Sequence, residues 1–101
     1  MGPRSRKVIW APSAYADLDD VLASRDNPGR LLEAVLDAAE SLSTFSDRGR
    51  VVPELDDPVT REIFVSDFRL MYEVSTEYVQ IVAFVYGARD FETWWREREQ
   101  R

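Results

Sequence analysis

The sequence predicts an α+β domain in which a helical hairpin covers one face of an antiparallel sheet. Residues 61–90 contain three successive stretches rich in Val, Ile, Phe and Tyr, separated by short polar breaks that suit hairpin turns. Two earlier segments carry apolar residues at helical spacing. Because a three-stranded meander needs cover on its apolar face, the helices are expected to pack there. We therefore expect a single domain over residues 1–101: an N-terminal strand, the helical hairpin, a three- to four-stranded antiparallel sheet and a short C-terminal helix.

The first half of the chain supplies the N-terminal strand and the hairpin. Residues 7–10 read as a strand, and Pro12 suits the first turn of a helix, where its missing N–H is not needed. This helix places apolar residues on one side and Asp17, Asp19 and Asp20 mostly on the solvent side. After a polar break, Asn27 is predicted as the N-cap and Pro28 as the first residue of a second helix. The apolar stripe of this second helix is predicted to contain Leu32, Val35, Leu36, Ala39 and Leu42 and to reach Phe45.

The second half of the chain supplies the sheet and the last helix. Residues 47–58 read as irregular, punctuated by glycine and proline, with room for a short strand at 50–52. Residues 91–101 read as a short, charged helix that carries Trp94 and Trp95. The three predicted strands lie at residues 61–65, 69–74 and 78–86.

Strand parity divides the side chains of the sheet between two faces, because successive side chains point to opposite sides. The predicted apolar face contains Ile63, Val65, Leu70, Tyr72, Val74, Val79, Ile81, Ala83 and Val85. The opposite face gathers polar side chains from all three strands: Glu62, Arg69, Glu73 and Tyr86. We expect this second face to carry the function.

Composition excludes several chemistries. The chain has no cysteine and no histidine, which removes thiol nucleophiles, thiolate metal sites, the commonest general base and the commonest metal ligand. We expect neither a metal nor a cofactor. The net charge of −6 argues against simple nucleic-acid binding, which needs basic residues. The basic N-terminus is followed by no signal-like apolar region, and the longest apolar run is too short for a bilayer, so a cytoplasmic location is expected.

Four blocks of sequence resemble one known family. VIWAPSAYADLDDV, RGRVVPEL, REIFVSDFRLMYEV and VYGARD are similar, in order and spacing, to the RelE/ParE superfamily of type II toxins. The resemblance runs from about Val8 to Asp90. It implies a small bacterial toxin held inactive in a hetero-oligomer with a cognate antitoxin. The antitoxin is expected to wrap the domain through an added strand or an amphipathic helix in a groove.

The resemblance implies two different modes of action. RelE-like and YoeB-like members cleave mRNA in the ribosomal A site, whereas ParE-like members poison DNA gyrase without nuclease chemistry. If the chain were such a nuclease, Glu54 would match the base and Arg69 the arginine that holds the phosphate. Arg89 would match a second catalytic arginine, and Tyr86 lies near an aromatic position of some members.

Departures from the nuclease pattern favour the ParE-like branch. Where RelE-like nucleases carry lysines on the strand before the FRLMY block, this chain reads Thr60-Arg61-Glu62, and it lacks their C-terminal histidine. Structural roles are open for each candidate. Arg69 could pair with Glu62 or Glu73, Glu54 could be solvated, Tyr86 could pack, and Arg89 could bond local carbonyls. A member that keeps the fold and the antitoxin but has lost toxicity is a third reading.

Three residues are candidates for partner binding. Trp94 and Trp95 are adjacent on a helix, where neighbours differ by ~100°, so both cannot face one core. Since tryptophan is enriched at binding hot spots, one of them is expected to meet an antitoxin or a second copy, although packing on the domain itself is equally open. The third candidate is Arg61, which lies in the Thr60-Arg61-Glu62 stretch where the chain departs from the nuclease pattern.

Overall fold

A computed structural model of the chain describes residues 5–99. Its strands are β1 (Lys7–Trp10), β2 (Arg50–Val51), β3 (Thr60–Val65), β4 (Phe68–Val74) and β5 (Tyr78–Tyr86). Its helices are α1 (Pro12–Ala23), α2 (Gly29–Ser41) and α3 (Phe91–Glu99). The α+β class, the element order and the three main strands are confirmed. The last two residues of the expected C-terminal helix, 100 and 101, lie outside the described residues.

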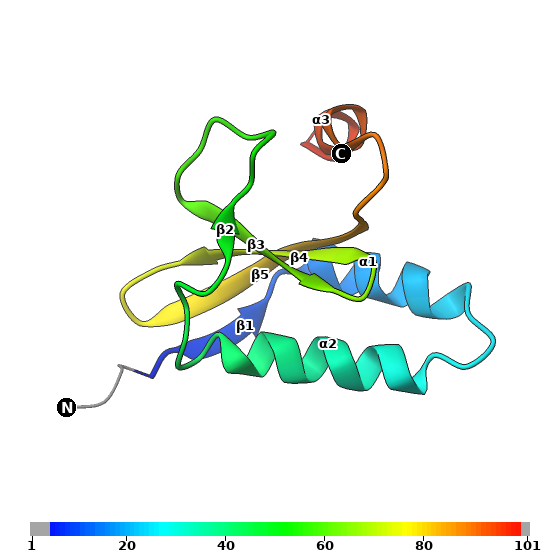
Figure 1. The fold of residues 1–101 in the computed structure, drawn as a ribbon, viewed down its shortest axis with the longest axis horizontal. Coiled ribbons are helices and arrows are strands. Elements are labelled where there is room, and N and C mark those ends of the chain that lie inside the picture. Colours follow the sequence, from blue (N-terminus) through cyan, green and yellow to red (C-terminus); the bar gives the residue numbers. More distant parts are fainter. Residues whose placement is uncertain (1–4, 100–101) are drawn as a thin grey trace.

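The sheet is larger than expected and mixed. Its five strands lie in the order β1-β5-β4-β3-β2 (Figure 1). β3, β4 and β5 form the predicted antiparallel meander, and the two-residue β2 extends it. The expected antiparallel sheet is confirmed for β2 to β5, and the predicted N-terminal strand adds a fifth strand at the other edge, where β1 pairs with β5 in parallel from Lys7↔Tyr78 to Trp10↔Ile81. No local sequence pattern predicts that a strand pairs with another strand so distant along the chain.

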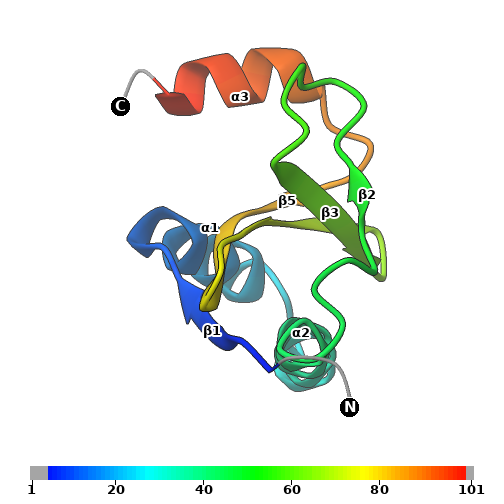
Figure 2. The same cartoon turned by 90° about the vertical axis from the view of Figure 1, so that its left-hand side faces the viewer.

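Helices cover both faces of the sheet (Figure 2). α1 and α2 lie together on one face, as predicted for the hairpin, and α3 lies on the other. The hairpin-side core is buried around α1, α2 and the inward side chains of the strands, among them Leu18, Val35, Leu42, Leu70 and Tyr72. A smaller cluster under α3 contains Val52, Met71, Ala83, Val85, Phe91 and Trp94. α3 begins after Asp90, whose carboxylate accepts hydrogen bonds from the backbone N–H and the hydroxyl of Thr93.

The start and the buried face of α2 differ from the prediction. Pro28, not Asn27, is the N-cap, and its carbonyl accepts a hydrogen bond from the N–H of Leu32 at 3.0 Å. Leu36 and Phe45 are 49% and 56% exposed, so neither belongs to the core. Four side chains at spacings of four, four and three residues make the buried stripe instead: Leu31, Val35, Ala39 and Leu42.

A β-bulge changes the parity of β5. Met71 of β4 pairs with Ala83, whereas the next residue, Tyr72, pairs with Ile81, so Val82 is an extra residue without a partner in β4. An extra residue in one strand moves every later side chain to the opposite face. The expectation that the alternate residues of this strand share one apolar face is therefore wrong beyond Val82.

The bulge also separates Tyr86 from the polar face. The hairpin side of β5 carries Val79, Ile81 and Phe84, and the α3 side carries Ala83 and Val85. Tyr86 follows Phe84 to the hairpin side, where its ring meets that of Phe68 edge-on at 5.7 Å. The prediction that Tyr86 emerges beside Arg69 is therefore wrong.

Candidate functional site

Two charged side chains predicted on the second face meet there, beneath α3. Arg69 of β4 and Glu62 of the neighbouring β3 point to the same side of the sheet, and the Nη1 atom of Arg69 lies 3.3 Å from the Oε1 atom of Glu62. Arg50 of β2 bonds the other oxygen of Glu62, at 2.7 Å. Arg69 is 8% exposed and Glu62 is 1% exposed. Both charges are thus removed from water and depend on partners.

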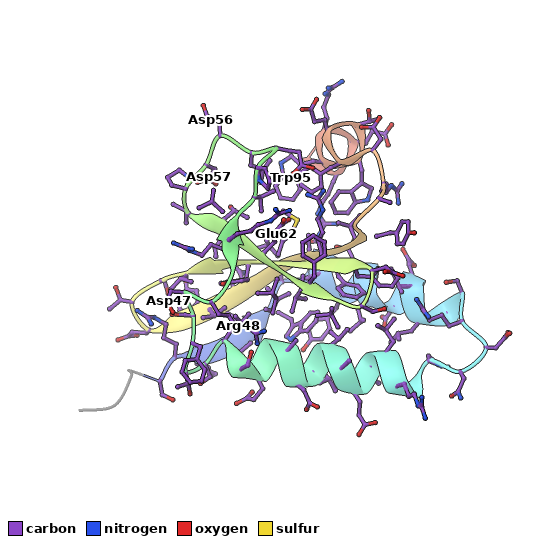
Figure 3. All side chains as sticks on the ribbon, viewed as in Figure 1. Asp47, Arg48, Asp56, Asp57, Glu62 and Trp95 are labelled. Atoms are coloured by element: carbon purple, nitrogen blue, oxygen red, sulfur yellow. The ribbon has the colours of Figure 1, made fainter. Side chains whose placement is uncertain are left out.

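The loop between β2 and β3 brings a second carboxylate to Arg69. Glu54 receives two hydrogen bonds from the guanidinium, at 2.8 and 2.7 Å, in the bidentate arrangement that suits arginine and carboxylate. The loop is held in place by the fully buried side chain of Val52 and by Asp57, which accepts hydrogen bonds from Val59 and Thr60. In Figure 3, Asp56 lies at the tip of this loop and Glu62 lies between the loop and the sheet.

The guanidinium of Arg69 is almost fully engaged. It has five N–H donors. Nη1 reaches Glu54 and Glu62, and Nη2 reaches Glu54 and the carbonyl oxygen of Gly87 at 3.4 Å. Its flat face covers the ring of Phe91, 4.9 Å from the ring centre. Its Nε atom is buried and has no hydrogen-bond partner among residues 5–99. Together, Arg50, Arg69, Glu54 and Glu62 form a neutral network, which we call the Arg69 network.

Electrostatics favour the charged forms of Glu54 and Arg69. Hydrogen bonds from Arg69 lower the pKa of Glu54 below its ordinary value, even though partial burial acts in the opposite direction. The same pairing with Glu54 raises the pKa of Arg69. A carboxylate with a lowered pKa holds its charge at neutral pH and is a poor proton acceptor there, because an efficient general base has a pKa near the working pH.

The other two candidates of the nuclease alternative lie outside the network. Tyr86 and Arg89 line a separate surface cavity of about 300 Å³, together with Asp17 and Asp20 of α1. Arg89 is exposed, and its guanidinium lies 5.9 Å from the ring centre of Trp94. The structure therefore brings Glu54 and Arg69 together but places Tyr86 and Arg89 elsewhere.

The candidate partner-binding residues differ in exposure. Trp94 is buried in the cluster under α3, whereas Trp95 is half-buried and stacks on Phe91 with ring centres 5.7 Å apart. Trp95 also lines a surface cavity of about 260 Å³ between α3 and the β2–β3 loop. Arg61 is half-buried, and it donates a hydrogen bond to the carbonyl oxygen of Gly49 at 2.8 Å. Of the three, Trp95 combines an aromatic surface with access from solvent.

Sequence reasoning also missed an ion pair between α1 and α3. Asp17 was expected on the solvent side of α1, but it bonds Arg98 of α3 at 2.6 Å, and both side chains are nearly buried. Its other carboxylate oxygen accepts a hydrogen bond from the N–H of Phe84 at 3.0 Å. Burial raises the pKa of Asp17 above its ordinary value, although the bond from Arg98 acts in the opposite direction. No sequence pattern reveals this pair, since it depends on how α1 and α3 meet.

Within residues 5–99, every helix is too short or too polar to span a bilayer. No group of three or more His, Cys, Asp and Glu side chains in the same range is placed to hold a metal ion.

The arrangement of a helical hairpin and a C-terminal helix around this sheet defines a RelE/ParE-like fold. The chain is similar to the chromosomal ParDE toxin–antitoxin system from P. aeruginosa (TM-score 0.64, 19% identity, 81% of this chain and 96% of that chain). It is similar to the RelBE2 toxin–antitoxin complex from Mycobacterium tuberculosis (TM-score 0.66, 23% identity, 85% and 95%). A YoeB/ParE toxin from Agrobacterium tumefaciens is also similar (TM-score 0.62, 15% identity, 79% and 96%). At these identities the likeness shows the fold.

The sequence itself shows the family. A family model described as the ParE toxin of the type II toxin-antitoxin system, parDE, matches residues 8–91, and the chain belongs to this family. No match was found among curated proteins. The resemblance read from the four sequence blocks is thereby confirmed, and the chain is a type II toxin of the RelE/ParE superfamily.

Proposed function

We propose that this chain acts by binding DNA gyrase and inhibiting it, without catalysis of its own, and that a cognate antitoxin neutralises it. The observation that carries this proposal is the state of Arg69. The side chain that would hold a phosphate in a nuclease is nearly buried, and its charge is balanced within the Arg69 network.

The chemistry of RNA cleavage gives this observation its weight. Attack of a 2′-OH on the adjacent phosphate needs a base, a cation for the transition state and an acid for the leaving oxygen. Four of the five donors of Arg69 already have partners, and the pKa of Glu54 is lowered. Tyr86 and Arg89 line a different cavity. A nuclease would have to open this network before it could bind a phosphate, which supports a binding function instead.

Charge supports the same proposal. The net charge of −6 would repel ribosomal RNA and mRNA, whereas a protein target need not be basic or acidic as a whole. The solvent faces of α1 and α2 carry many of the acidic residues: Asp19, Asp20, Glu33, Asp37 and Glu40. A gyrase surface with basic residues would meet these faces favourably.

The antitoxin partnership is supported by the similar structures. Several are toxin–antitoxin complexes by title, among them RelBE2 from Mycobacterium tuberculosis and DinJ–YafQ from E. coli. We infer that the antitoxin of this chain lies over the helical hairpin and reaches the edge of the sheet. Co-expression with the product of the neighbouring gene should give a stable complex on purification. Separate elution of the two proteins would contradict this inference.

Paired assays with purified protein test the mode of action. Incubation with gyrase and plasmid should give linear DNA only when both proteins are present. Ribosomes carrying a defined mRNA should leave that mRNA intact under the same conditions. Arg69→Met and a matched control on α3, Arg96→Ala, should both keep the effect on gyrase in proportion to the folded protein present.

The opposite result would support the mRNA endonuclease. Codon-positioned cleavage of ribosome-bound mRNA, lost in Arg69→Met and retained in Arg96→Ala, would make the Arg69 network an active site and refute the proposal. A folded protein that affects neither gyrase nor mRNA would point to a member that has lost toxicity.

A further inference from the structure

The outer edge of β5 is open beyond the bulge. β1 pairs with β5 only as far as Trp10↔Ile81, and the N–H of Ala11 then bonds the carbonyl oxygen of Ile81 at 2.9 Å as the chain turns into α1. In the part of the chain that the structure describes, no strand lies beside residues 82–86 on this side. An open edge presents N–H and C=O groups that another extended chain can pair with.

Two side chains take the place of a strand at this edge. The Oδ2 atom of Asp17 accepts a hydrogen bond from the N–H of Phe84 at 3.0 Å, and the Nη2 atom of Arg98 donates to the carbonyl oxygen of Val82 at 2.8 Å. The same two side chains bond each other at 2.6 Å. Asp17 and Arg98 thus supply one acceptor and one donor to the edge, as a neighbouring backbone would.

Space for a peptide lies on both sides of this ion pair. One surface cavity, of about 430 Å³, is lined by Asp17, Asp20, Val82, Trp95 and Arg98 among others. The cavity of about 300 Å³ described above shares Asp17 and Asp20 and adds aromatic walls from Phe68, Phe84, Tyr86 and Trp94. In Figure 2, α1 and α3 face each other from opposite sides of the sheet. We call the two cavities and the strand edge between them the β5-edge groove.

We propose that the Asp17–Arg98 pair is a displaceable cap on the β5-edge groove, and that the antitoxin inserts an extended segment there whose Lys or Arg replaces Arg98 on Asp17. Displacing Arg98 would leave the nearly buried carboxylate of Asp17 without its ion-pair partner, while Asp20 and Arg89, which line the same cavity, are exposed to solvent. A segment that paired with Val82 and Phe84 would therefore need a positively charged side chain next to Asp17, because an unpaired charge in a largely buried site is strongly unfavourable. Apolar neighbours of that residue would fill the aromatic cavity.

This inference rests on the antitoxin partnership proposed above and adds the chemistry and place of the segment. The test uses the full chain and the antitoxin that co-purifies with it. Arg98→Ala should raise the affinity for the antitoxin about fivefold, because the segment no longer competes with the cap. The same variant should lower the stability of the free toxin. Arg96→Ala, a change on the same helix at an exposed position, should leave both unchanged.

The opposed effects on affinity and stability separate a cap from a simple structural bond. If Arg98 only fastened α3, its loss would weaken the antitoxin complex or leave it unchanged, and the proposal would be overturned. If Arg98→Ala does not fold, Arg98→Lys serves as the second variant. Lysine keeps the positive charge but lacks the second nitrogen, with which Arg98 bonds the carbonyl oxygen of Val82. This variant should raise the affinity about twofold, and an unchanged or lower affinity would again overturn the proposal.

Overlapping ten-residue peptides that tile the antitoxin test the segment itself. One peptide with a Lys or Arg should bind, and replacing that residue by alanine should weaken its binding about tenfold. Methylating its backbone nitrogens should abolish binding, because pairing with the strand edge requires them. Binding that survives both changes would refute the proposed segment. If no antitoxin co-purifies at all, the partnership itself fails, which is a different result from a complex that ignores Arg98.

Discussion

Removing Arg69 is expected to destabilise the fold strongly. Among the described residues, Arg69→Ala leaves the carboxylate of Glu62, whose side chain is 0% exposed, with Arg50 as its one remaining ionic partner. Breaking a buried ion pair by removing one partner generally costs about 3–5 kcal/mol. Arg50 keeps its bond to Glu62, and Glu54, 28% exposed, can regain water. We therefore expect a loss near the lower end, about 3 kcal/mol, which is a large share of the 5–15 kcal/mol typical of a small domain.

Urea unfolding measures this loss through tryptophan fluorescence. The midpoint should fall while the slope stays constant, since the surface exposed on unfolding hardly changes. Adding Glu62→Gln to Arg69→Ala should restore about 1–2 kcal/mol of the free energy of unfolding, because the double variant has no carboxylate at position 62 that has lost a partner. If Arg69→Ala cost less than about 1 kcal/mol, or if the double variant were no more stable than the single one, the assignment of Glu62 as a dependent buried charge would be wrong.

Three further predictions concern packing and pH. Gly49→Ala should cost about 1–3 kcal/mol, because the added Cβ would lie 2.5 Å from the hydroxyl of buried Tyr72 and 2.6 Å from a backbone oxygen. Gly29→Ala should be neutral or stabilising, because the space around Gly29 is open. Thermal unfolding of the two variants measures the difference in stability. Leu42, at the C-cap of α2, is fully buried, so Leu42→Ala should cost about 2–5 kcal/mol. Leu36, within α2, is 49% exposed, so Leu36→Ala should cost under about 1 kcal/mol; equal losses would contradict the observed stripe. The folded pKa of Glu54 is depressed, so its stabilising contribution should be present above pH 4.5 and be lost as the pH falls through the folded pKa. Glu54→Gln should lose this part of the acid dependence, as urea titrations at several pH values can show.

The sequence was most informative where hydrophobic periodicity is strong. The strands of the meander and the two amphipathic helices follow from periods of two and 3.6 residues. Parity within β3 and β4 also predicted that Glu62 and Arg69 share a face, and the structure brings them into contact. The bulge at Val82 could not be predicted, because valine is an ordinary strand residue and nothing local distinguishes an extra one.

The candidate site was harder to predict because its parts come from different elements. The position of Glu54 depends on a loop whose shape is set by the burial of Val52 and the bonds of Asp57. Sequence could therefore suggest a solvated Glu54 or a base, but not a bidentate partner of Arg69. The pairing of Asp17 with Arg98 likewise depends on how two helices, from opposite ends of the chain, meet at a sheet edge.

The parallel pairing of β1 with β5 has a consequence for how the protein is made. Lys7 pairs with Tyr78, so the first strand has no place in the sheet until the last strand has been synthesised. At roughly 5–20 residues per second, this delay is on the order of several seconds. Contacts so distant in sequence also slow folding, because the long intervening chain must be closed first. A nascent chain that still lacks β5 therefore cannot form the finished fold, and an antitoxin made at the same time has that interval in which to be present when the fold is completed.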